Sequence, residues 1–473
     1  MDWAAGDGPL YLRLAQALRR AAERGELTPG ERLPAERLLA QALGISRSTV
    51  VASYEQLADD GWLERRQGSG TYVAIGRGGQ ASEALPDAGS AFGELFGAGE
   101  DVIDFSLAAP LAAPAVLDAL GHLAGYAADA ETLGRGYLPA GLPGLRSAIA
   151  GYLTAIGLDS AERHILVTSG GQQAISLLAS LWVSRGDAVV VESPSYPGAL
   201  DAFRAAGARL LTIPVDDDGA DVGSLRELLA RAAVRVVYVT PSYNNPTGSL
   251  LSHTRRRELA RIAQEFQVPI IEDLVTAESV LVPGAEVPPV GSFSGDGWIT
   301  TIGSMSKLFW GGLRVGWVRG SEQTVFRLTQ LKALADLGSS LLPQFASLEL
   351  FGRLAEVRAW RRADCQPRLH ALRGWLSEYL PDWAWQEPAG GNDLWVHLPR
   401  GSATEFLQLA SRFGVSAAAG PLFSADGGHA DYVRLSFLLD EADLKEGVRR
   451  LAQAWRAYLP RSAAPANQVR TVV

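Results

Sequence analysis

The sequence is nearly devoid of cysteine and poor in histidine. Cys365 is the one cysteine in 473 residues, which excludes an internal disulfide and a cysteine-based zinc site. The six histidines are scattered without the spacing of metal ligands. We therefore expect neither a disulfide framework nor a metal site.

Long apolar runs are also missing. No stretch of about 18 uninterrupted apolar residues occurs, and the N-terminal stretch MDWAAGDGPLYLRLAQALRR is acidic and then amphipathic, unlike a signal peptide. We expect a cytoplasmic protein with no membrane partner. The formal net charge of -9 argues against indiscriminate binding of nucleic acid, but it leaves room for a local DNA-binding face.

Lysine is the rare cation of this chain. Of the 43 lysines and arginines only three are lysine, and one of them is Lys307, in the stretch TIGSMSKLFWGGLRVGWV. Arginine keeps its charge and is not a nucleophile, whereas lysine can lose its proton and form an imine with an aldehyde. Lys307 is therefore a candidate catalytic residue, and it raises the question of an aldehyde cofactor.

Residues 1–74 have the pattern of a winged helix-turn-helix domain. Apolar residues between 9 and 24 repeat at helical spacing, and a second helical segment, AERLLAQAL, follows the break GELTPGERLP. A third helix is expected to begin after Ser46 as its N-cap, with Ile45 and Val50 in contact as a hydrophobic staple. The stretch WLERRQGSGTYVA then predicts two short strands joined by a glycine-rich turn.

The third helix supplies the candidate DNA-reading residues. The second helix of such a motif enters the major groove, and its first side chains, here Arg47, Ser48 and Thr49, approach base edges. Arginines and acids nearly balance in this segment, so a helical hairpin used for protein contacts is the alternative. Further candidates for contact with phosphates or the minor groove are Arg32, Arg37, Arg65, Arg66 and Gly68.

The remaining chain divides into a tether and a large domain. Residues 75–101 are rich in glycine, alanine and serine and predict a flexible linker. Over residues 102–473, short β-branched runs alternate with helical segments. The runs HILVTS, AVVVES, VRVVYVTP, VPIIEDL and WITTIGS predict a mostly parallel central sheet covered by helices on both faces, which is an α/β fold.

Each predicted strand ends in a turn with chemically useful residues, and open α/β sheets bind ligands at the carboxyl ends of their strands. Gly171 and Gln172 open a helix after HILVTS, where backbone N–H groups can hold a phosphate, or they form only a tight turn. Tyr196 follows AVVVES and either stacks on a flat ring or lies in the core. Asn245 in TPSYNNPTG either donates to a ring oxygen or forms a simple turn.

Two further turns carry charge. Asp273 follows VPIIE and either binds a protonated pyridine nitrogen or caps a helix. The stretch WITTIGSMSK delivers Ser304 and Lys307, and Arg314 follows with a guanidinium suited to a phosphate. An imine-forming lysine, a pyridinium-binding acid, a ring-stacking tyrosine, an amide and phosphate ligands together predict a site for pyridoxal 5'-phosphate.

Both halves of the chain resemble known families. The string from GPLYLRL to GSGTYV resembles the winged-helix domain of the GntR family, and Arg37, Arg47 and Thr49 fall where that family contacts operator DNA. Over roughly residues 100–460 the chain resembles fold-type I aminotransferases. The matching motifs, in order, are GYLPAGLPGLR, TSGGQQ, PSYNNPTG, IIED, SMSK, GLRVGW and VRLSF.

The aminotransferase resemblance implies roles for these residues. It makes Lys307 the residue that links covalently to pyridoxal phosphate, pairs Asp273 with the pyridine nitrogen, stacks Tyr196 on the ring and bonds Asn245 to the 3'-oxygen. Arg434 in YVRLSF matches the arginine that grips a substrate carboxylate, with an ordinary strand-end ion pair as the alternative. The implied phosphate ligands are Gly171, Gln172, Ser304, Arg314 and, from a second subunit, Tyr137.

The sequence departs from the aminotransferase pattern at one position. The family usually places a tyrosine shortly after the pyridine-binding aspartate, as a donor to the 3'-oxygen. Here Asp273 is followed by Leu274, Val275, Thr276 and Ala277. Loss of that donor should raise the pKa of the imine, which leaves transaminase activity open and threatens cofactor binding less.

The fusion of the two halves resembles the MocR/GabR subfamily of GntR-type transcription regulators. This resemblance implies a head-to-tail homodimer on double-stranded operator DNA. Pyridoxal phosphate, or its adduct with an amino acid or amine effector, would bias how the two heads bind the DNA. The alternative is an active aminotransferase that carries an accessory DNA-binding head.

Overall fold

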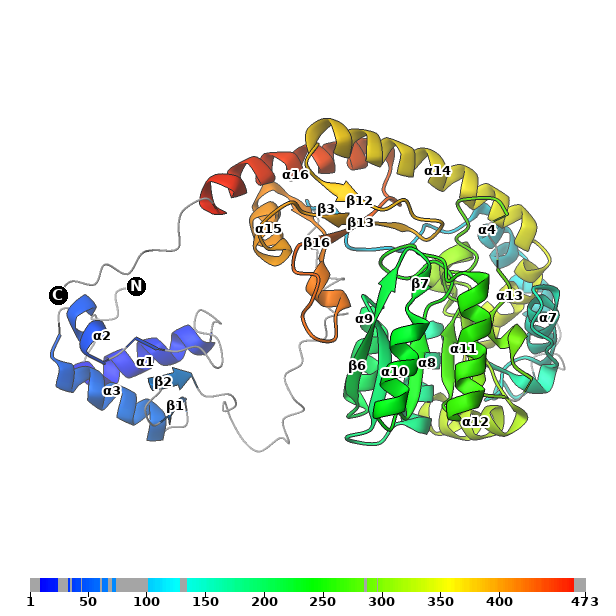
Figure 1. Cartoon of the computed structure of the whole chain (residues 1–473), viewed down its shortest axis with the longest axis horizontal. Helices are drawn as coiled ribbons and strands as arrows, with labels where there is room; N and C mark the ends of the chain where they lie inside the picture. The colour runs from blue at the N-terminus through cyan, green and yellow to red at the C-terminus, as the bar shows by residue number, and fades with distance from the viewer. Residues whose placement is uncertain are drawn as a thin grey trace. The chain divides into compact units, whose positions relative to one another are not determined.

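The computed structural model divides the chain into two compact units, one within residues 1–88 and one within residues 89–473 (Figure 1). The structure describes residues 9–23, 33–34, 36–43, 45–59, 62–66, 70–73, 101–127, 134–284, 287–295 and 297–462. The predicted linker, residues 75–101, lies outside the described residues except for Asp101.

The smaller unit has the three helices and the β-wing expected from its sequence. The helices are α1 (Leu10–Glu23), α2 (Glu36–Leu43) and α3 (Arg47–Asp59). The strands β1 (Leu63–Arg66) and β2 (Gly70–Val73) pair antiparallel, with Leu63 opposite Val73. The predicted order of helices and strands is confirmed.

The start of α3 is held by the cap that the sequence predicted. The Thr49 N–H donates to Ser46 Oγ at 3.1 Å, which satisfies one of the amides that lack a partner inside the helix. Val50 is fully buried, and Ile45 packs against the same core. Tyr54 is also buried in this core, and its hydroxyl donates to the Pro34 carbonyl at 3.0 Å.

The larger unit is built on an eight-stranded sheet. Its strands, in spatial order, are β4 (Ile165–Thr168), β11 (Gly316–Arg319), β10 (Ile299–Ser304), β9 (Ile270–Asp273), β8 (Val236–Val239), β5 (Ala188–Ser193), β6 (Arg209–Asp216) and β7 (Gly219–Ala220). Strand β11 is antiparallel to both its neighbours, so β4 runs in the same direction as β10. The carboxyl ends of β4, β5, β8, β9 and β10 therefore meet at one edge, as the sequence predicted.

Helices cover both faces of this sheet, because its strands are apolar on both sides. Val189 and Val191 of β5 pack in one core with α8 (Gly171–Trp182), α9 (Pro197–Ala205) and α12 (Glu322–Asp336). Val190 packs in another with α10 (Val222–Arg231) and α11 (His253–Phe266). Among the described residues, the other α-helices before the C-terminal subdomain are α4 (Pro114–Gly121), α5 (Leu123–Ala127), α7 (Pro143–Ala155) and α13 (Leu341–Phe351).

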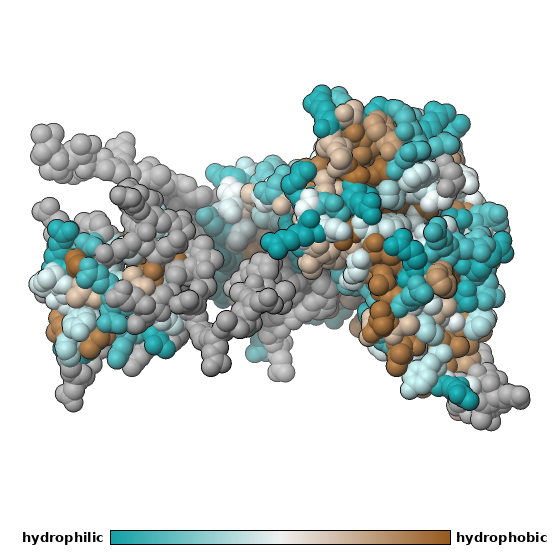
Figure 2. All heavy atoms as spheres, turned by 90° about the horizontal axis from the view of Figure 1, so that it is seen from below, coloured by the Kyte–Doolittle hydropathy of each residue, from teal (hydrophilic) through white to brown (hydrophobic). Residues whose placement is uncertain are grey.

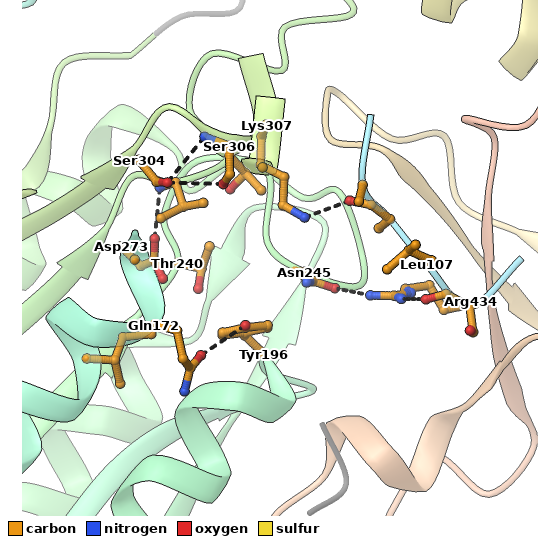
Figure 3. A pocket seen from close by; sticks show the side chains of 18 of the residues that line it. Leu107, Gln172, Tyr196, Thr240, Asn245, Asp273, Ser304, Ser306, Lys307 and Arg434 are labelled. Atoms are coloured by element: carbon orange, nitrogen blue, oxygen red, sulfur yellow. Dashed lines mark hydrogen bonds between the residues drawn. The ribbon is translucent and has the colours of Figure 1, made fainter. Parts of the chain in front are cut away.

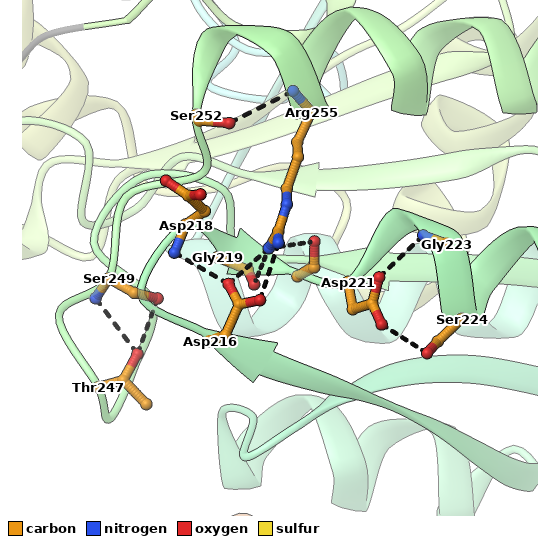
Figure 4. Close-up of polar contacts among 11 residues, drawn as sticks. Asp216, Asp218, Gly219, Asp221, Gly223, Ser224, Thr247, Ser249, Ser252 and Arg255 are labelled. Atoms are coloured by element: carbon orange, nitrogen blue, oxygen red, sulfur yellow. Dashed lines mark hydrogen bonds and ion pairs between the residues drawn. The ribbon is translucent and has the colours of Figure 1, made fainter.

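Polar side chains fix the helix starts on the outer edge of the sheet (Figure 4). The Asp221 carboxylate caps α10 by accepting from the Gly223 N–H, and Ser252 Oγ caps α11 by accepting from the Arg255 N–H. The guanidinium of Arg255 binds Asp216, at the end of β6, with two hydrogen bonds. These contacts join β6, α10 and α11 at one corner of the unit.

A second, smaller sheet forms the C-terminal subdomain. Strands β12 (Ala384–Trp385), β13 (Asp393–His397), β16 (Tyr432–Ser436) and β15 (Ala418–Ala419) pair antiparallel, and α14 (Leu354–Tyr379), α15 (Ala403–Ala410) and α16 (Glu441–Ser462) accompany them. Strand β3 (Ile103–Asp104) pairs in parallel with β14 (Val415–Ser416). The chain therefore enters the larger unit through this subdomain. Within the described residues no helix is long and apolar enough to cross a bilayer.

We predict that Ser46→Ala lowers the stability of α3 by about 1 kcal/mol, because the N-cap acceptor is lost. Hydrogen exchange of the α3 peptide in the intact chain should then become about fivefold faster. Ser48→Ala is the matched control, since it keeps the Ser46 cap. Equal exchange in the two variants would contradict the assigned cap.

Candidate functional site

One cavity of about 440 Å³ lies at the carboxyl edge of the main sheet (Figure 3). Its volume falls within the range usual for small-molecule sites, roughly 300 to 1,000 Å³. The sequence-predicted residues that line it are Gly171, Gln172, Tyr196, Asn245, Asp273, Ser304, Lys307, Arg314 and Arg434. Turns that are far apart in the sequence therefore meet in one place.

Lys307 projects into this cavity from a short π-helical turn, η4 (Ser306–Trp310), that follows β10. Its Nζ donates to the Ala108 carbonyl at 2.6 Å. Burial lowers the pKa of the Lys307 ammonium, while the nearby carboxylates of Asp393 and Asp273 act in the opposite direction. A lowered pKa increases the share of neutral amine, which is the nucleophilic form.

Asp273 ends β9 as a buried carboxylate, with 4% of its surface exposed. The Tyr238 hydroxyl donates to Oδ2 at 2.6 Å, and the Val275 N–H donates to Oδ1 at 2.8 Å. Burial raises the pKa of Asp273 to about 6, and these two hydrogen bonds limit the rise. A buried carboxylate of this kind favours a cationic partner such as a pyridinium.

Tyr196 lies over the start of α8, where its hydroxyl donates to Gln172 Oε1 at 3.0 Å. Gln172 Nε2 donates in turn to the Gly198 carbonyl at 2.8 Å. A Cβ at Gly198 would lie 2.4 Å from Gln172 Oε1 and 2.6 Å from the Tyr196 hydroxyl, so glycine leaves the space that this pair occupies. The aromatic face of Tyr196 is thereby held at the cavity.

The phosphate-binding candidates gather at the N-terminus of α8. Gly170 has a φ of +99°, and α8 begins at Gly171 with backbone N–H groups that have no acceptor inside the helix. Arg314 Nη2 donates to the Ser169 carbonyl at 2.6 Å, which brings the guanidinium beside this helix start. Ser304 Oγ lies 3.1 Å from Ser306 Oγ. Hydroxyls, a guanidinium and helix amides are the groups that bind phosphate.

Arg434 reaches the cavity from β16 of the smaller sheet and is 2% exposed. Its Nη1 donates to Asn245 Oδ1 at 3.1 Å, and its Nη2 donates to the Ser106 carbonyl. Its Nε lies 3.5 Å from Asp393 Oδ1. Arg434 thus joins the two sheets, and the ion pair that the sequence left as an alternative is present.

Thr276 also lines the cavity, among the residues that follow Asp273 in place of the usual tyrosine. Its Oγ1 donates to the Ser242 carbonyl at 2.7 Å. The threonine hydroxyl is therefore committed to the backbone, so it does not replace the donor that the sequence lacks.

Tyr137 does not line the cavity of its own chain. Its side chain is 70% exposed. The expectation that it serves the site of a second copy stays a prediction.

Sequence reasoning missed several residues of this site. Tyr238 supports Asp273 from the middle of β8, where a tyrosine in a β-branched run indicates only core. Asp393 stands in GGNDLWV, two residues after a glycine pair, and no motif of the sequence marked it. Ser106 and Ala108, whose carbonyls accept from Arg434 and Lys307, carry no side-chain signal.

In the smaller unit the structure describes only some of the residues predicted to contact DNA. Arg47, Ser48 and Thr49 stand at the start of α3, and the Arg47 side chain is 69% exposed and pairs with Glu36 at 3.2 Å. Thr49 Oγ1 and Ser48 Oγ both lie within 3.0 Å of Ser46 Oγ, at 2.7 and 2.9 Å. Arg37 lies in α2, and Arg65 and Arg66 lie in β1, but their side chains are outside the described part of the structure, as are Arg32 and Gly68.

The fold and the cavity define a class of protein: a winged-helix unit joined to an α/β unit whose strand ends surround a half-buried lysine. The family model for class I and II aminotransferases matches residues 100–451, and the model for bacterial regulatory proteins of the gntR family matches residues 10–73. The chain belongs to the class I and II aminotransferase family and carries a gntR-type domain at its N-terminal end.

Relatives and solved structures agree with this assignment. The HTH-type transcriptional regulator YisV of Bacillus subtilis is 30% identical, over 96% of this chain and 97% of its own. The probable rhizopine catabolism regulatory protein MocR of Rhizobium meliloti is 28% identical, over 98% and 97%. The alpha-aminoadipate aminotransferase LysN of Thermus thermophilus, complexed with N-(5'-phosphopyridoxyl)-L-leucine, is 28% identical and covers 79% of this chain and 96% of its own, with a TM-score of 0.71.

Pyridoxal 5'-phosphate is the cofactor that this family assigns to the domain, and the cavity fits it. The volume suits a cofactor of that size, and the donor set matches its parts. Lys307 can meet the aldehyde, the Asp273 carboxylate can meet the ring nitrogen, and the start of α8 can meet the phosphate.

We predict that binding of pyridoxal phosphate to the cofactor-free protein weakens as the pH falls from 7 to 5. The Asp273 carboxyl, with its pKa raised to about 6, is ionised above that pH and becomes protonated below it. The protonated acid cannot stabilise a pyridinium, so affinity should fall by up to about tenfold per pH unit below pH 6. Absorbance titrations at several pH values measure this.

Asp273→Asn is the control for that titration. It leaves the titrations of the lysine and of the phosphate in place and removes only that of the carboxyl group. The difference between the two pH profiles should therefore follow the pKa of Asp273, and identical profiles would contradict the prediction.

Proposed function

We propose that this protein is a pyridoxal-phosphate-dependent transcription regulator. Its winged helix would bind double-stranded operator DNA, and its aminotransferase-like domain would sense the cofactor and an amino acid or amine effector. One observation carries the proposal: the chain that places Lys307 and the Asp273 carboxylate in one cavity also exposes Arg47 on a reading helix. Relatives of nearly the same length are named as transcriptional regulators. Such a protein works in the cytoplasm.

The proposed domain boundaries are those predicted from the sequence. Residues 1–74 are the DNA-binding domain, residues 75–101 are the linker and residues 102–473 are the effector domain. Arg47, Ser48 and Thr49 are the proposed base-reading residues. The proposed phosphate contacts on DNA are Arg32, Arg37, Arg65, Arg66 and Gly68.

The roles within the cavity follow from the chemistry of the groups that line it. Pyridoxal phosphate, when bound, supplies an aldehyde and a ring that accepts electrons. Lys307 would bind the aldehyde covalently, Asp273 would keep the ring nitrogen protonated, Tyr196 would stack on the ring and Asn245 would donate to the 3'-oxygen. The proposed phosphate ligands are Gly171, Gln172, Ser304 and Arg314, with Tyr137 from a second copy.

Arg434 is the proposed binding group for an effector carboxylate. Its guanidinium lies at the cavity, and a planar pair of N–H donors suits a carboxylate. Its present hydrogen bonds to Asn245 and Ser106 would have to rearrange on binding. Arg434 therefore links occupancy of the cavity to the contact between the two sheets.

The proposed assembly is a homodimer in which the two chains are arranged head to tail. Apolar side chains are exposed on the larger unit, and Figure 2 shows such patches on one of its faces. The exposed apolar side chains of this unit include Leu107, which also lines the cavity, and Leu111, Leu334 and Leu342. Exposed apolar patches of this kind support burial against a second copy, which would bring the partner's Tyr137 to the site.

Aminotransferase activity is the second candidate function. The presence of Lys307, Asp273 and Arg434 in one cavity favours it. The hydrogen bond from Thr276 Oγ1 to the Ser242 carbonyl disfavours it, because this hydroxyl then does not replace the tyrosine donor that aminotransferases usually have after the aspartate. Release of keto acids from amino acids by the purified, cofactor-loaded protein would distinguish an enzyme from a sensor.

We predict that Lys307→Ala abolishes the covalent attachment of pyridoxal phosphate and leaves the protein folded. Borohydride reduction followed by intact-mass measurement should find the cofactor on the wild-type chain only. In gel-shift experiments with the DNA upstream of its own gene, cofactor and amino acids should change binding of the wild type, but not of the variant. Lys332→Ala is the control lysine. A cofactor adduct that persists in Lys307→Ala would show that another lysine reacts.

We predict that Arg47→Ala weakens operator binding by about 1 to 3 kcal/mol, as expected when a base contact is lost. The ion pair with Glu36 is exposed and costs little to break, so it should not prevent Arg47 from reaching DNA. Arg231→Ala, an exposed arginine of α10, is the matched control. Unchanged affinity of Arg47→Ala would place recognition on other residues.

A further inference from the structure

A buried carboxylate stands next to Lys307 and has no role in the scheme above. Asp393 opens β13 and is 7% exposed. Its Oδ1 accepts no hydrogen bond from the described residues, and its nearest cation is Arg434, whose Nε lies 3.5 Å away. Burial of a carboxylate that lacks its full set of hydrogen bonds is costly, so Asp393 calls for an explanation.

Asp393 faces a second cavity and not the large one. This second cavity has a volume of about 10 Å³, and Asp393 lines it together with Asn245, Thr276 and Lys307. That volume is about enough for one water molecule. An amino acid or amine effector does not fit there, so Asp393 is not an effector-binding group. The ammonium group of one of the protein's own lysines does fit.

Lys307 supplies that ammonium group, because it borders both cavities. The charged groups that act on it are Asp393, Asp273 and Arg434. Of the two carboxylates, Asp273 already accepts a hydrogen bond on each oxygen, from Tyr238 and from the Val275 N–H, and it is the one proposed to meet the ring nitrogen. Asp393 is the carboxylate whose Oδ1 accepts no hydrogen bond from the described residues and can therefore accept one from an ammonium group.

We propose that Asp393 is a positioning residue that holds the ammonium group of Lys307 after an amine has replaced this lysine on the cofactor. The inference rests on the proposed function. In the exchange, the C=N bond to Lys307 breaks and a C=N bond to the amine forms. Two protons pass from the incoming ammonium nitrogen to the lysine nitrogen. No oxidant or reductant takes part, and Lys307 leaves with a positive charge that Asp393 balances.

This role has a consequence for proton balance. When an alkylammonium enters and Lys307 leaves as an ammonium, the exchange releases no proton to solvent. Without the Asp393 charge the pKa of Lys307 is lower still, and at a pH above that pKa each exchange releases one proton. The exchange equilibrium of such a variant must depend on pH, whereas that of the wild type must not.

Methylamine is the probe for this test. It has no carboxylate, so it does not depend on Arg434, and it is an alkylammonium with a pKa close to that of lysine, about 10.4. Wild type and Asp393→Asn are loaded with pyridoxal phosphate and titrated with methylamine at pH 7, 8 and 9. Borohydride then traps each mixture, and intact mass gives the fraction of chains that keep the cofactor on Lys307.

For the wild type we expect a half-displacing methylamine concentration that stays constant over this pH range. For Asp393→Asn we expect a higher value at pH 7 that falls about tenfold with each pH unit. Asp431→Asn removes a partly exposed carboxylate that pairs with His397 outside the cavities, and it should match the wild type. If Asp393 had only a structural role, its replacement would not make the half-displacing methylamine concentration change tenfold with each pH unit.

Two results would overturn the proposal. One is a half-displacing methylamine concentration that changes tenfold per pH unit in the wild type itself. This result would show that Lys307 leaves as a neutral amine, and it can be obtained without a variant. The other is an Asp393→Asn chain that loads cofactor and exchanges with the pH dependence of the wild type. A wild-type chain that carries no cofactor after borohydride reduction would contradict the proposed function itself. Failure of the proposed function can therefore be distinguished from failure of the role proposed for Asp393.

Discussion

The cavity depends on one buried negative charge, the Asp273 carboxylate at the end of a parallel strand. Desolvation favours its neutral form, and the hydrogen bonds from Tyr238 and the Val275 N–H, together with the charge of Lys307, oppose this. Tyr238 reaches it because β8 and β9 pair in parallel, with Tyr238 beside Ile271. The register of two strands thus brings a hydrogen-bond donor to the group that is proposed to bind the cofactor's ring nitrogen.

Other buried carboxylates fix the turns around Asp273. Glu192, at the end of β5, accepts from the Thr240 N–H and from Asn244 Nδ2, both at 2.9 Å, and burial raises its pKa to about 8. These bonds join the ends of β5 and β8 and hold the turn that contains Asn245. The strand ends are therefore tied to one another by interior polar contacts, which keep the cavity's side chains in place without a ligand.

The sequence predicted what depends on local pattern. Short β-branched runs gave the strands, and the turns after them gave Lys307 and Asp273, because side chains at strand ends are fixed by the strands themselves. Tyr238 and Asp393 were missed because their roles come from contacts with residues far away in the chain. The smaller sheet was missed as well, since strands as short as Ala384–Trp385 and Ala418–Ala419 carry no periodic signal. The head was predicted element by element, because its cap and staple are local.

The segment that enters the larger unit connects the cavity to the rest of the chain. Strand β3 pairs with β14, and directly after it the Ser106 carbonyl accepts from Arg434 and the Ala108 carbonyl accepts from Lys307. A ligand changes an equilibrium between two arrangements only through contacts that differ between them. Two of the cations that are proposed to meet cofactor or effector, Lys307 and Arg434, hold this entry segment through hydrogen bonds. In the proposed roles, covalent use of Lys307 would remove its hydrogen bond to Ala108, and an effector carboxylate at Arg434 would compete with Ser106. Occupancy of the cavity would then change the contacts of the backbone with which the larger unit begins.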